Sequence, residues 1–319
     1  MYELARKQAQ VAYENNFEGF FAANHYLVGP AVAMFQPLTL LSHLLGAFPN
    51  MYIGTSIFLL PFHHPVDVAE QTASLDILSG GKFLFGVGQG YRDIEFESFG
   101  IDKSIRRRRF VEGIQAIRKL WAGDNVSFDG EFFRFEGVSI NPKPIQTPGP
   151  PILIGADTVS SVSKVPEIGD YWIASRRHSQ SFLRKALPAY KEALERSGRS
   201  FRGLPIFRDL CVADSGEEAE RRVKQAIEEM YQLYHRWGQP GERYDLSFEE
   251  LKQERLVVGN PKEVTEQVIL YHEEFGAEFM WFNVYWPGME PQWALDTIER
   301  FGNEAIPEIK KATPICQIP

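Results

Sequence analysis

The chain has few cysteines, no long apolar run and no excess of positive charge. Its two cysteines, Cys211 and Cys316, are over a hundred residues apart and have no metal-binding or redox spacing. Because structural disulfides belong to oxidising compartments, we expect a reduced protein in the cytoplasm. No stretch of about 18 apolar residues and no signal peptide is present, so no membrane segment is predicted. His63 and His64 lack partner ligands at a suitable spacing, and no metal site is expected.

The net charge is −8, from 34 Lys and Arg against 42 Asp and Glu. A chain with this balance lacks the basic footprint that binds nucleic acid or an anionic membrane, and neither partner is expected. The one basic run, Arg106 to Arg109, precedes helically spaced apolar residues. We interpret it as a solvated or ion-pairing helix start rather than an anion clamp.

Residues 50–99 predict a β-α-β unit. The first apolar run, Met51 to Leu60, has too many adjacent apolar and β-branched residues for a half-exposed strand. Helical spacing follows from Pro65 to Leu78, and a second apolar strand, Lys82 to Val87, leads into Gly88-Gln89-Gly90. A helix between two strands requires parallel pairing, and ligands of parallel α/β sheets bind at the carboxyl ends of the strands.

The same alternation continues along the chain and predicts one α/β barrel domain over residues 1–319, with insertions near 123–150 and 235–256. Asp129-Gly130 indicates a hairpin in the first insertion, and the second has the composition of a lid or surface loop. The expected strands are residues 17–23, 51–60, 82–87, 152–154, 171–174, 204–213 and 278–284. The expected helices are residues 3–15, 37–47, 65–78, 107–122, 158–167, 179–196, 217–233, 262–275 and 292–301.

Several motifs along the chain carry a family resemblance. They are Leu60-Pro61-Phe62-His63-His64-Pro65-Val66, Gly86-Val87-Gly88-Gln89-Gly90, Phe128-Asp129-Gly130, Pro142-Lys143-Pro144-Ile145-Gln146 and Gly259-Asn260-Pro261-Lys262-Glu263-Val264. In this order they resemble the bacterial luciferase-like flavin-dependent monooxygenases, whose superfamily includes F420-dependent enzymes. The resemblance covers nearly the whole chain and implies a TIM-type (β/α)8 barrel.

Members of that family open with a short apolar strand, whereas the first element expected here is the helix at Glu3. Seven strands are predicted instead of eight. We therefore expect either a start upstream of Met1 or a barrel without its first strand, in which two neighbouring strands would have unpaired backbone groups.

His25 is the candidate catalytic residue, because it should lie at the carboxyl end of the strand at 17–23. A histidine can exchange a proton near neutral pH, although a loop histidine held by hydrogen bonds would look the same in sequence. In the family, a strand-end Glu-His-His is common, and its first histidine is implicated in the reaction of reduced flavin with oxygen. Asn24-His25-Tyr26 matches that motif only at His25.

The resemblance also implies flavin contacts near the ends of the β-α-β strands. Ser56 lies where the family often has a non-prolyl cis peptide bond against the flavin ring. Gln89 replaces an arginine that meets the flavin phosphate, so it keeps donors but loses the charge. Gly90 permits close backbone approach, and Arg92 is a candidate to compensate for the missing charge.

A second phosphate site is expected where the strand at 152–154 ends and a helix begins. Backbone amides at a helix start and nearby hydroxyl groups bind phosphate. The candidates are Gly155, Ala156, Asp157, Thr158 and Ser161, of which the last three fall on family phosphate-loop positions. Alternatively, Asp157 or Thr158 is an ordinary helix N-cap.

The resemblance implies an enzyme that uses reduced FMN and O2 to oxygenate a small, largely apolar organic molecule, as a homodimer or larger oligomer. No nicotinamide-binding fingerprint is present, so a flavin reductase should supply the reduced FMN. One alternative is an F420-dependent hydride-transfer oxidoreductase of the same superfamily. Another is a flavin-binding protein without turnover, which the missing strand and the changes at Asn24 and Gln89 favour.

Overall fold

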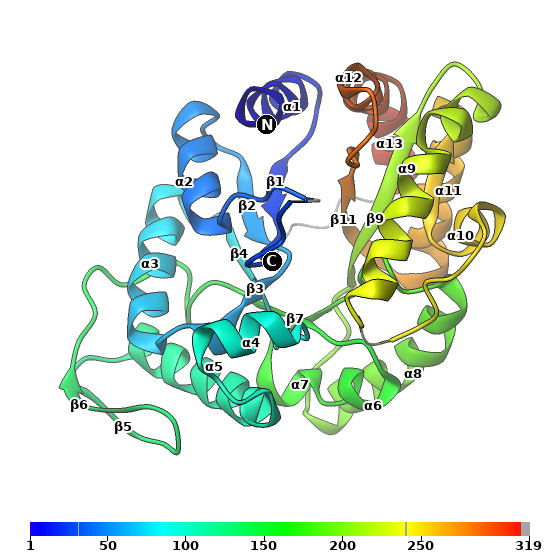
Figure 1. Ribbon diagram of the computed structural model, residues 1–319. Helices are drawn as coiled ribbons and strands as arrows, with labels where there is room; N and C mark the ends of the chain where they lie inside the picture. The colour runs from blue at the N-terminus through cyan, green and yellow to red at the C-terminus, as the bar shows by residue number, and fades with distance from the viewer. Residues whose placement is uncertain (31, 240, 314–319) are drawn as a thin grey trace. The chain divides into compact units, whose positions relative to one another are not determined.

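The computed structural model describes residues 1–30, 32–239 and 241–313 (Figure 1). The chain divides into two compact units, which are described separately. Unit 2 comprises residues 18–155 and 167–171, and unit 1 comprises residues 1–17, 156–166 and 172 onward.

Unit 2 is built on parallel strands in the order β1-β2-β4-β7, with the short β3 also paired to β4. The strands are β1 (Gly19–Ala22), β2 (Tyr52–Thr55), β3 (Phe58–Leu59), β4 (Phe83–Gly88) and β7 (Ile152–Gly155). Every residue of β4 is buried, as expected for a strand covered on both faces. Because the strands are parallel, their carboxyl ends share one edge of the sheet.

Helices cover this sheet, with α2 against β1 and β2 and α3 against β4 (Figure 1). They are α2 (Pro37–Ala47), η1 (Leu60–Phe62), α3 (Pro65–Leu78), α4 (Asp93–Phe99), η2 (Lys103–Ile105) and α5 (Arg106–Ala122). The predicted bounds of α2 and α3 are confirmed, since Pro37 and Pro65 each occupy a first helical turn. The basic run starts α5, as predicted.

Two details of unit 2 differ from or refine the prediction. The single strand expected at 51–60 is divided, because the Ser56–Ile57 peptide bond is cis and separates β2 from β3. Helix α4 was not predicted, since seven residues are too few to show an apolar period. The expected hairpin is present as β5 (Val126–Asp129) and β6 (Arg134–Val138), which pair antiparallel.

Unit 1 contains a parallel sheet in the order β10-β9-β11, formed by β9 (Leu204–Val212), β10 (Leu256–Gly259) and β11 (Ala277–Asn283). Its helices are α1 (Tyr2–Glu14), α6 (Val159–Val162), α8 (Gln180–Arg196), α9 (Gly216–Arg236), α10 (Phe248–Glu254), α11 (Pro261–Phe275), α12 (Pro291–Arg300), η3 (Phe301–Ala305) and α13 (Ile306–Ala312). No helix in the described residues is long and apolar enough to cross a membrane.

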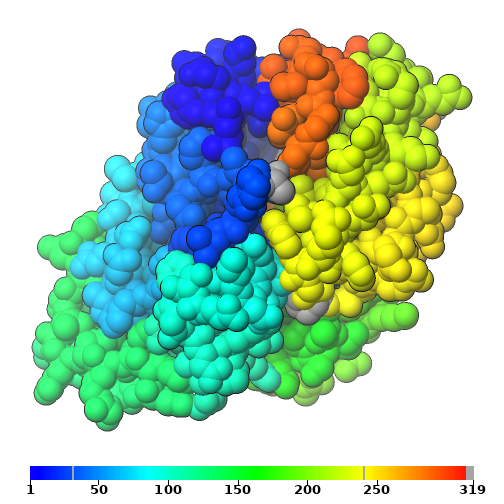
Figure 2. Space-filling view, in the orientation of Figure 1, coloured from blue at the N-terminus to red at the C-terminus, as the bar shows by residue number. Residues whose placement is uncertain are grey.

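The segment expected to be a lid or loop is more regular than predicted. It contains α10, which begins with a capping box between Ser247 and Glu250, and it is followed by β10, which was not predicted as a strand. Residues 241–255 lie at the surface of unit 1 beside α9 (yellow in Figure 2). The helix expected at 158–167 is divided into α6 and α7 (Val165–Ile168). Helix α7 and strand β8 (Tyr171–Ile173) each have residues in both units.

Candidate functional site

In unit 2, His25 follows β1 and contacts Glu95 of α4. Nδ1 of His25 lies 2.9 Å from Oε1 of Glu95, and the same oxygen accepts the Tyr26 backbone N–H at 2.9 Å. Since that oxygen serves as an acceptor, Nδ1 of the neutral ring is the donor and Nε2 is unprotonated. His25 therefore combines a fixed orientation with a ring nitrogen that can accept a proton.

Arg92 holds the loop that carries His25. Its guanidinium donates to the carbonyl of Tyr26 at 2.6 Å, to the carbonyl of Leu27 at 3.2 Å and to Oε1 of Glu95 at 3.4 Å. The side chain is buried. The Arg92 guanidinium thus stabilises both the loop after β1 and the Glu95 carboxylate.

A contact between Tyr26 and a second histidine, His63, stabilises the same loop. The Oη of Tyr26 lies 3.0 Å from Nε2 of His63, and the His63 ring stacks on Phe58 with 4.3 Å between centroids. Burial lowers the pKa of His63 to about 4, partly offset by the charge of Asp67. His63 is therefore neutral near pH 7, and its Nε2 shares one hydrogen bond with the Tyr26 hydroxyl.

The half-buried His63 should make unfolding pH-dependent. Between its ordinary pKa of 6.5 and the folded value of about 4, the unfolded chain binds a proton that the folded chain does not. Stability contributed by this residue is therefore present above pH 6.5 and lost as the pH falls to about 4, by roughly 3 kcal/mol. We expect the thermal midpoint of the His63→Gln variant to fall less from pH 7 to pH 4.5 than that of the wild type. His64→Gln, an exposed neighbour, should retain the wild-type pH dependence, and equal slopes in all three proteins would contradict the assignment.

The cis peptide bond expected near Ser56 lies where three strand ends of unit 2 meet. A Cβ added to Gly88 would lie 1.8 Å from Cδ1 of Ile57, and one added to Gly155 would lie 3.3 Å from the same atom. Only glycine therefore fits at 88 with Ile57 in place. Gln89 is half-buried in the following turn, and Gly90 has φ +74°, a conformation that favours glycine.

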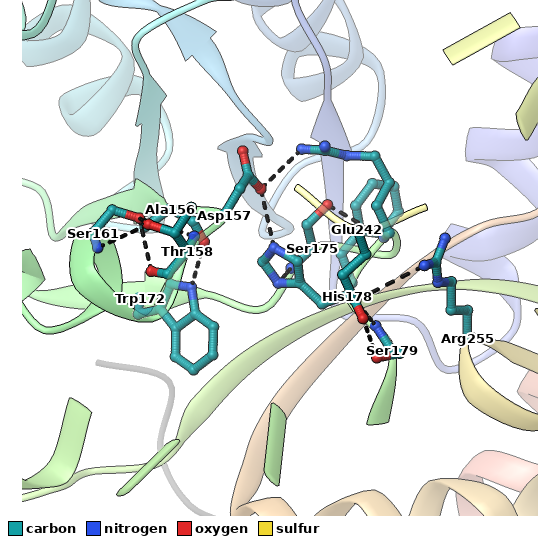
Figure 3. A network of polar contacts seen from close by, with 12 residues as sticks. Ala156, Asp157, Thr158, Ser161, Trp172, Ser175, His178, Ser179, Glu242 and Arg255 are labelled. Atoms are coloured by element: carbon teal, nitrogen blue, oxygen red, sulfur yellow. Dashed lines mark hydrogen bonds and ion pairs between the residues drawn. The ribbon is translucent and has the colours of Figure 1, made fainter. Parts of the chain in front are cut away.

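In unit 1, Thr158 and Ser161 begin α6 as a capping box. Oγ1 of Thr158 accepts the Ser161 N–H at 3.1 Å, and Oγ of Ser161 accepts the Thr158 N–H at 3.0 Å (Figure 3). The N-cap role considered for Thr158 is confirmed. Ala156 is buried, and its carbonyl accepts the Trp172 indole N–H at 3.1 Å. The backbone before the capping box is thereby fixed.

Asp157 binds a histidine and an arginine that sequence analysis missed. Its Oδ1 lies 3.0 Å from Nε2 of His178 and 3.2 Å from the guanidinium of Arg177. The Ser175 N–H donates to Nδ1 of His178 at 3.2 Å, so the His178 proton resides on Nε2 (Figure 3). Burial alone would raise the pKa of Asp157, but the Arg177 charge and the His178 hydrogen bond lower it to about 2. Asp157 is therefore an ionised partner of both residues near pH 7.

Two residues of the segment 241–247 complete this network. Tyr244 accepts a hydrogen bond from Arg177 at 2.8 Å. Glu242 accepts the Ser179 N–H at 2.7 Å and its hydroxyl at 2.6 Å, which ties the segment to the start of α8 (Figure 3). Because these partners are more than sixty positions apart, no local sequence pattern could have revealed them.

A buried ion pair lies deeper in unit 1. The guanidinium of Arg176 is 2.6 Å from Oδ1 of Asp209 in β9, and Asp209 is fully buried. Tyr231 donates to Oδ2 of Asp209 at 3.2 Å, and Tyr234 also contacts Arg176. Burial opposes the charge of Arg176, but Asp209 raises the pKa of Arg176 above its ordinary value. Asp209 therefore compensates the charge of Arg176 in the interior of unit 1.

The chain is similar to one protein family and to several characterised proteins. A family model described as luciferase-like monooxygenase matches residues 2–278. The oxygenase component of the flavin-dependent trigonelline monooxygenase of Acinetobacter baylyi is 25% identical, over 98% of this chain and 91% of its own. The F420-dependent hydroxymycolic acid dehydrogenase of Mycobacterium tuberculosis is 32% identical, over 67% of this chain and 60% of its own.

The crystal structure of the monooxygenase RslO1 from Streptomyces bottropensis is similar to this chain with a TM-score of 0.84 and 25% identity, covering 96% of this chain and 93% of its own. With the parallel strands and alternating helices, this similarity confirms the predicted luciferase-like α/β barrel. The relatives also confirm an enzyme that catalyses an oxidation or reduction. The chain therefore belongs to the luciferase-like monooxygenase family.

Proposed function

We propose that this enzyme uses reduced FMN and O2 to oxygenate a small, largely apolar organic molecule. The observation that carries the proposal is His25, held by Glu95 at the edge of the unit 2 sheet where ligands of parallel sheets bind. The similarity to a flavin-dependent oxygenase component over 98% of the chain supports it. The ring of Tyr91 packs edge-on against the His25 ring, with 5.5 Å between centroids.

The donors present in unit 1 fit the phosphate of FMN. Thr158 is exposed and Ser161 half-buried, and their hydroxyl oxygens lie 2.9 Å apart. Phosphate could take the place of this internal hydrogen bond. Arg177 brings a positive charge beside Asp157 in the same network, and guanidinium groups bind phosphate well. Arg177 is therefore added to the candidates that the sequence predicted.

In unit 2, the proposed contacts of the flavin ring are Ser56, Gln89 and Gly90, which follow β2 and β4. When bound, reduced FMN supplies the electrons that activate O2. The protein holds the substrate, excludes water and moves a proton. Nε2 of His25 can accept a proton from the substrate or return one to a developing oxygen anion.

A separate flavin reductase is proposed as the source of reduced FMN. The test combines the purified protein with FMN, NADH, O2 and a flavin reductase and measures oxygen consumption and oxygenated product for a panel of small apolar compounds. Product is expected with the reductase, and also without it when reduced FMN is added directly. NADH oxidation by the protein alone would contradict the need for a reductase.

The second candidate is F420-dependent hydride transfer, which the 32% identity to an F420-dependent dehydrogenase supports. Anaerobic titration with reduced FMN and with reduced F420, followed by mixing with oxygenated buffer, separates the two functions. Tighter binding of FMN and an oxygen-dependent product support the monooxygenase. Tight binding of F420 and oxidation of substrate without oxygen would replace it.

The double variant Thr158→Ala/Ser161→Ala should weaken FMN binding about 10- to 100-fold, because hydrogen bonds to a charged phosphate are lost. Titration of flavin fluorescence measures the affinity. Ser160 is an exposed serine in the same helix, and the Ser160→Ala protein should bind FMN normally. The Thr158→Ser protein, which keeps a hydroxyl group, should bind FMN more tightly than the Thr158→Ala protein. An unchanged dissociation constant in the double variant would remove both residues from the phosphate site.

A further inference from the structure

Glu95 is a buried carboxylate, and its hydrogen bonds with the described part of the chain all go to one oxygen, Oε1. The side chain is 0% exposed. Oε1 accepts from the Tyr26 N–H and from Arg92, and it lies 2.9 Å from Nδ1 of His25. Oε2 is also buried but has no hydrogen-bond partner among the residues that the structure describes. The oxygen with every partner is therefore the one that faces the candidate catalytic histidine.

The residue before His25 has a different role. Asn24 is buried, and its amide donates to Gln36 at 3.0 Å and accepts the Leu59 N–H at 3.1 Å. These bonds fix the loop after β1 to β3. The carboxylate at the His25 ring comes instead from α4, 70 positions later in the sequence.

The contact determines which nitrogen of His25 can react. A neutral imidazole has one proton, and the hydrogen bond made by one nitrogen sets the state of the other. Because Oε1 of Glu95 accepts N–H donors from Tyr26 and Arg92, Nδ1 of His25 approaches it as a third donor. A carboxylate in this position both orients a histidine and selects its tautomer.

We infer that Glu95 is the positioning residue of His25. It holds the neutral ring with its proton on Nδ1, so that Nε2 is the nitrogen that exchanges a proton with the substrate. This inference rests on the proposed function, since it gives His25 the proton transfer. Glu95 acts through His25 and touches neither substrate nor cofactor.

The tautomer can be measured on the intact enzyme without turnover. The seven histidines of a 15N-histidine-labelled protein are observed by long-range 1H–15N NMR near pH 8, and the His25 signal is identified by its absence in His25→Gln. We expect Nδ1 to be protonated in the wild type. A wild-type His25 with its proton on Nε2 would overturn the inference, whatever the activity of the enzyme.

A double-mutant cycle tests whether Glu95 acts through His25. Glu95→Ala should lower kcat on the order of 10- to 100-fold, as is typical when the partner of a functional histidine is lost. In the His25→Ala background it should cause no further loss, because the residue that it positions is absent. Equal losses in both backgrounds would show that Glu95 acts independently of His25.

Two further variants exclude a merely structural effect. Glu97→Ala removes an exposed carboxylate from the same helix and should leave kcat and the His25 tautomer unchanged. Glu95→Asp, which retains the carboxylate, should recover part of the turnover lost in Glu95→Ala. If Glu95→Ala does not fold, the wild-type tautomer still decides the inference. If His25 proves dispensable for turnover but carries its proton on Nδ1, the proposed function fails while the positioning by Glu95 stands.

Discussion

Replacing His25 with alanine is expected to lower turnover by roughly 100- to 10,000-fold, the range of a lost general acid or base. The affinity for FMN should change little, because the proposed phosphate donors Thr158 and Ser161 are unaffected. Turnover and FMN affinity should respond differently because His25 follows β1 and is held by Glu95 through Nδ1. Single-turnover rates with reduced FMN, O2 and substrate measure the first effect, and anaerobic flavin titration measures the second.

His43 provides the matched control for this experiment. It lies in unit 2 and is exposed on α2, so His43→Ala should keep both turnover and FMN affinity. A His25→Ala enzyme with wild-type turnover would remove His25 from the mechanism. Loss of FMN binding in parallel with turnover would instead make His25 a binding residue.

Replacing Asp209 with alanine is expected to lower the free energy of unfolding by about 3–5 kcal/mol. The change leaves the guanidinium of Arg176 without its carboxylate partner at 2.6 Å and removes the acceptor of the Tyr231 hydroxyl. An unpaired charge in a buried position is costly because the protein interior solvates it poorly. Equilibrium urea unfolding followed by tryptophan fluorescence measures the loss.

Asp245→Ala is the control for the Asp209 variant. Asp245 also pairs with an arginine, Arg243, but both side chains are more than half exposed, and solvent weakens such a pair. We expect its unfolding midpoint to stay close to that of the wild type. A similar stability for Asp209→Ala and Asp245→Ala would show that the buried pair contributes no more than the exposed one.

Elements with a long, regular apolar pattern were predictable from sequence. Helices α2 and α3 have their predicted bounds because proline marks each first turn. Two short elements, α4 and β10, were missed, although the strand at 152–154 was predicted in spite of its similar length. Helix α4 and strand β10 contain only seven and four residues, so their type is decided by the sheet and helices around them rather than by their own periodicity.

Residues of the candidate site could be predicted only where they come after a strand or at the start of a helix. His25 could be chosen because the strand before it ends at a sheet edge, and Thr158 because a helix begins there. Glu95 could not be recognised as the partner of His25, since 70 positions separate them and the contact exists only after α4 packs. The same applies to Arg177 and Tyr244, which are 67 positions apart.

The spacing of Arg92 and Glu95 has a consequence for how this enzyme can diverge. Arg92 bonds the carbonyls of residues 26 and 27, while Glu95, three positions later, bonds the Tyr26 N–H and the His25 ring. One residue of an α-helix turns about 100° around its axis. A single insertion or deletion between Arg92 and Glu95 would therefore point the two side chains in different directions. Arg92 could then no longer bond the loop carbonyls while Glu95 bonds the His25 ring. Homologues and engineered chimeras that keep both functions should preserve this interval even where the neighbouring loops differ in length.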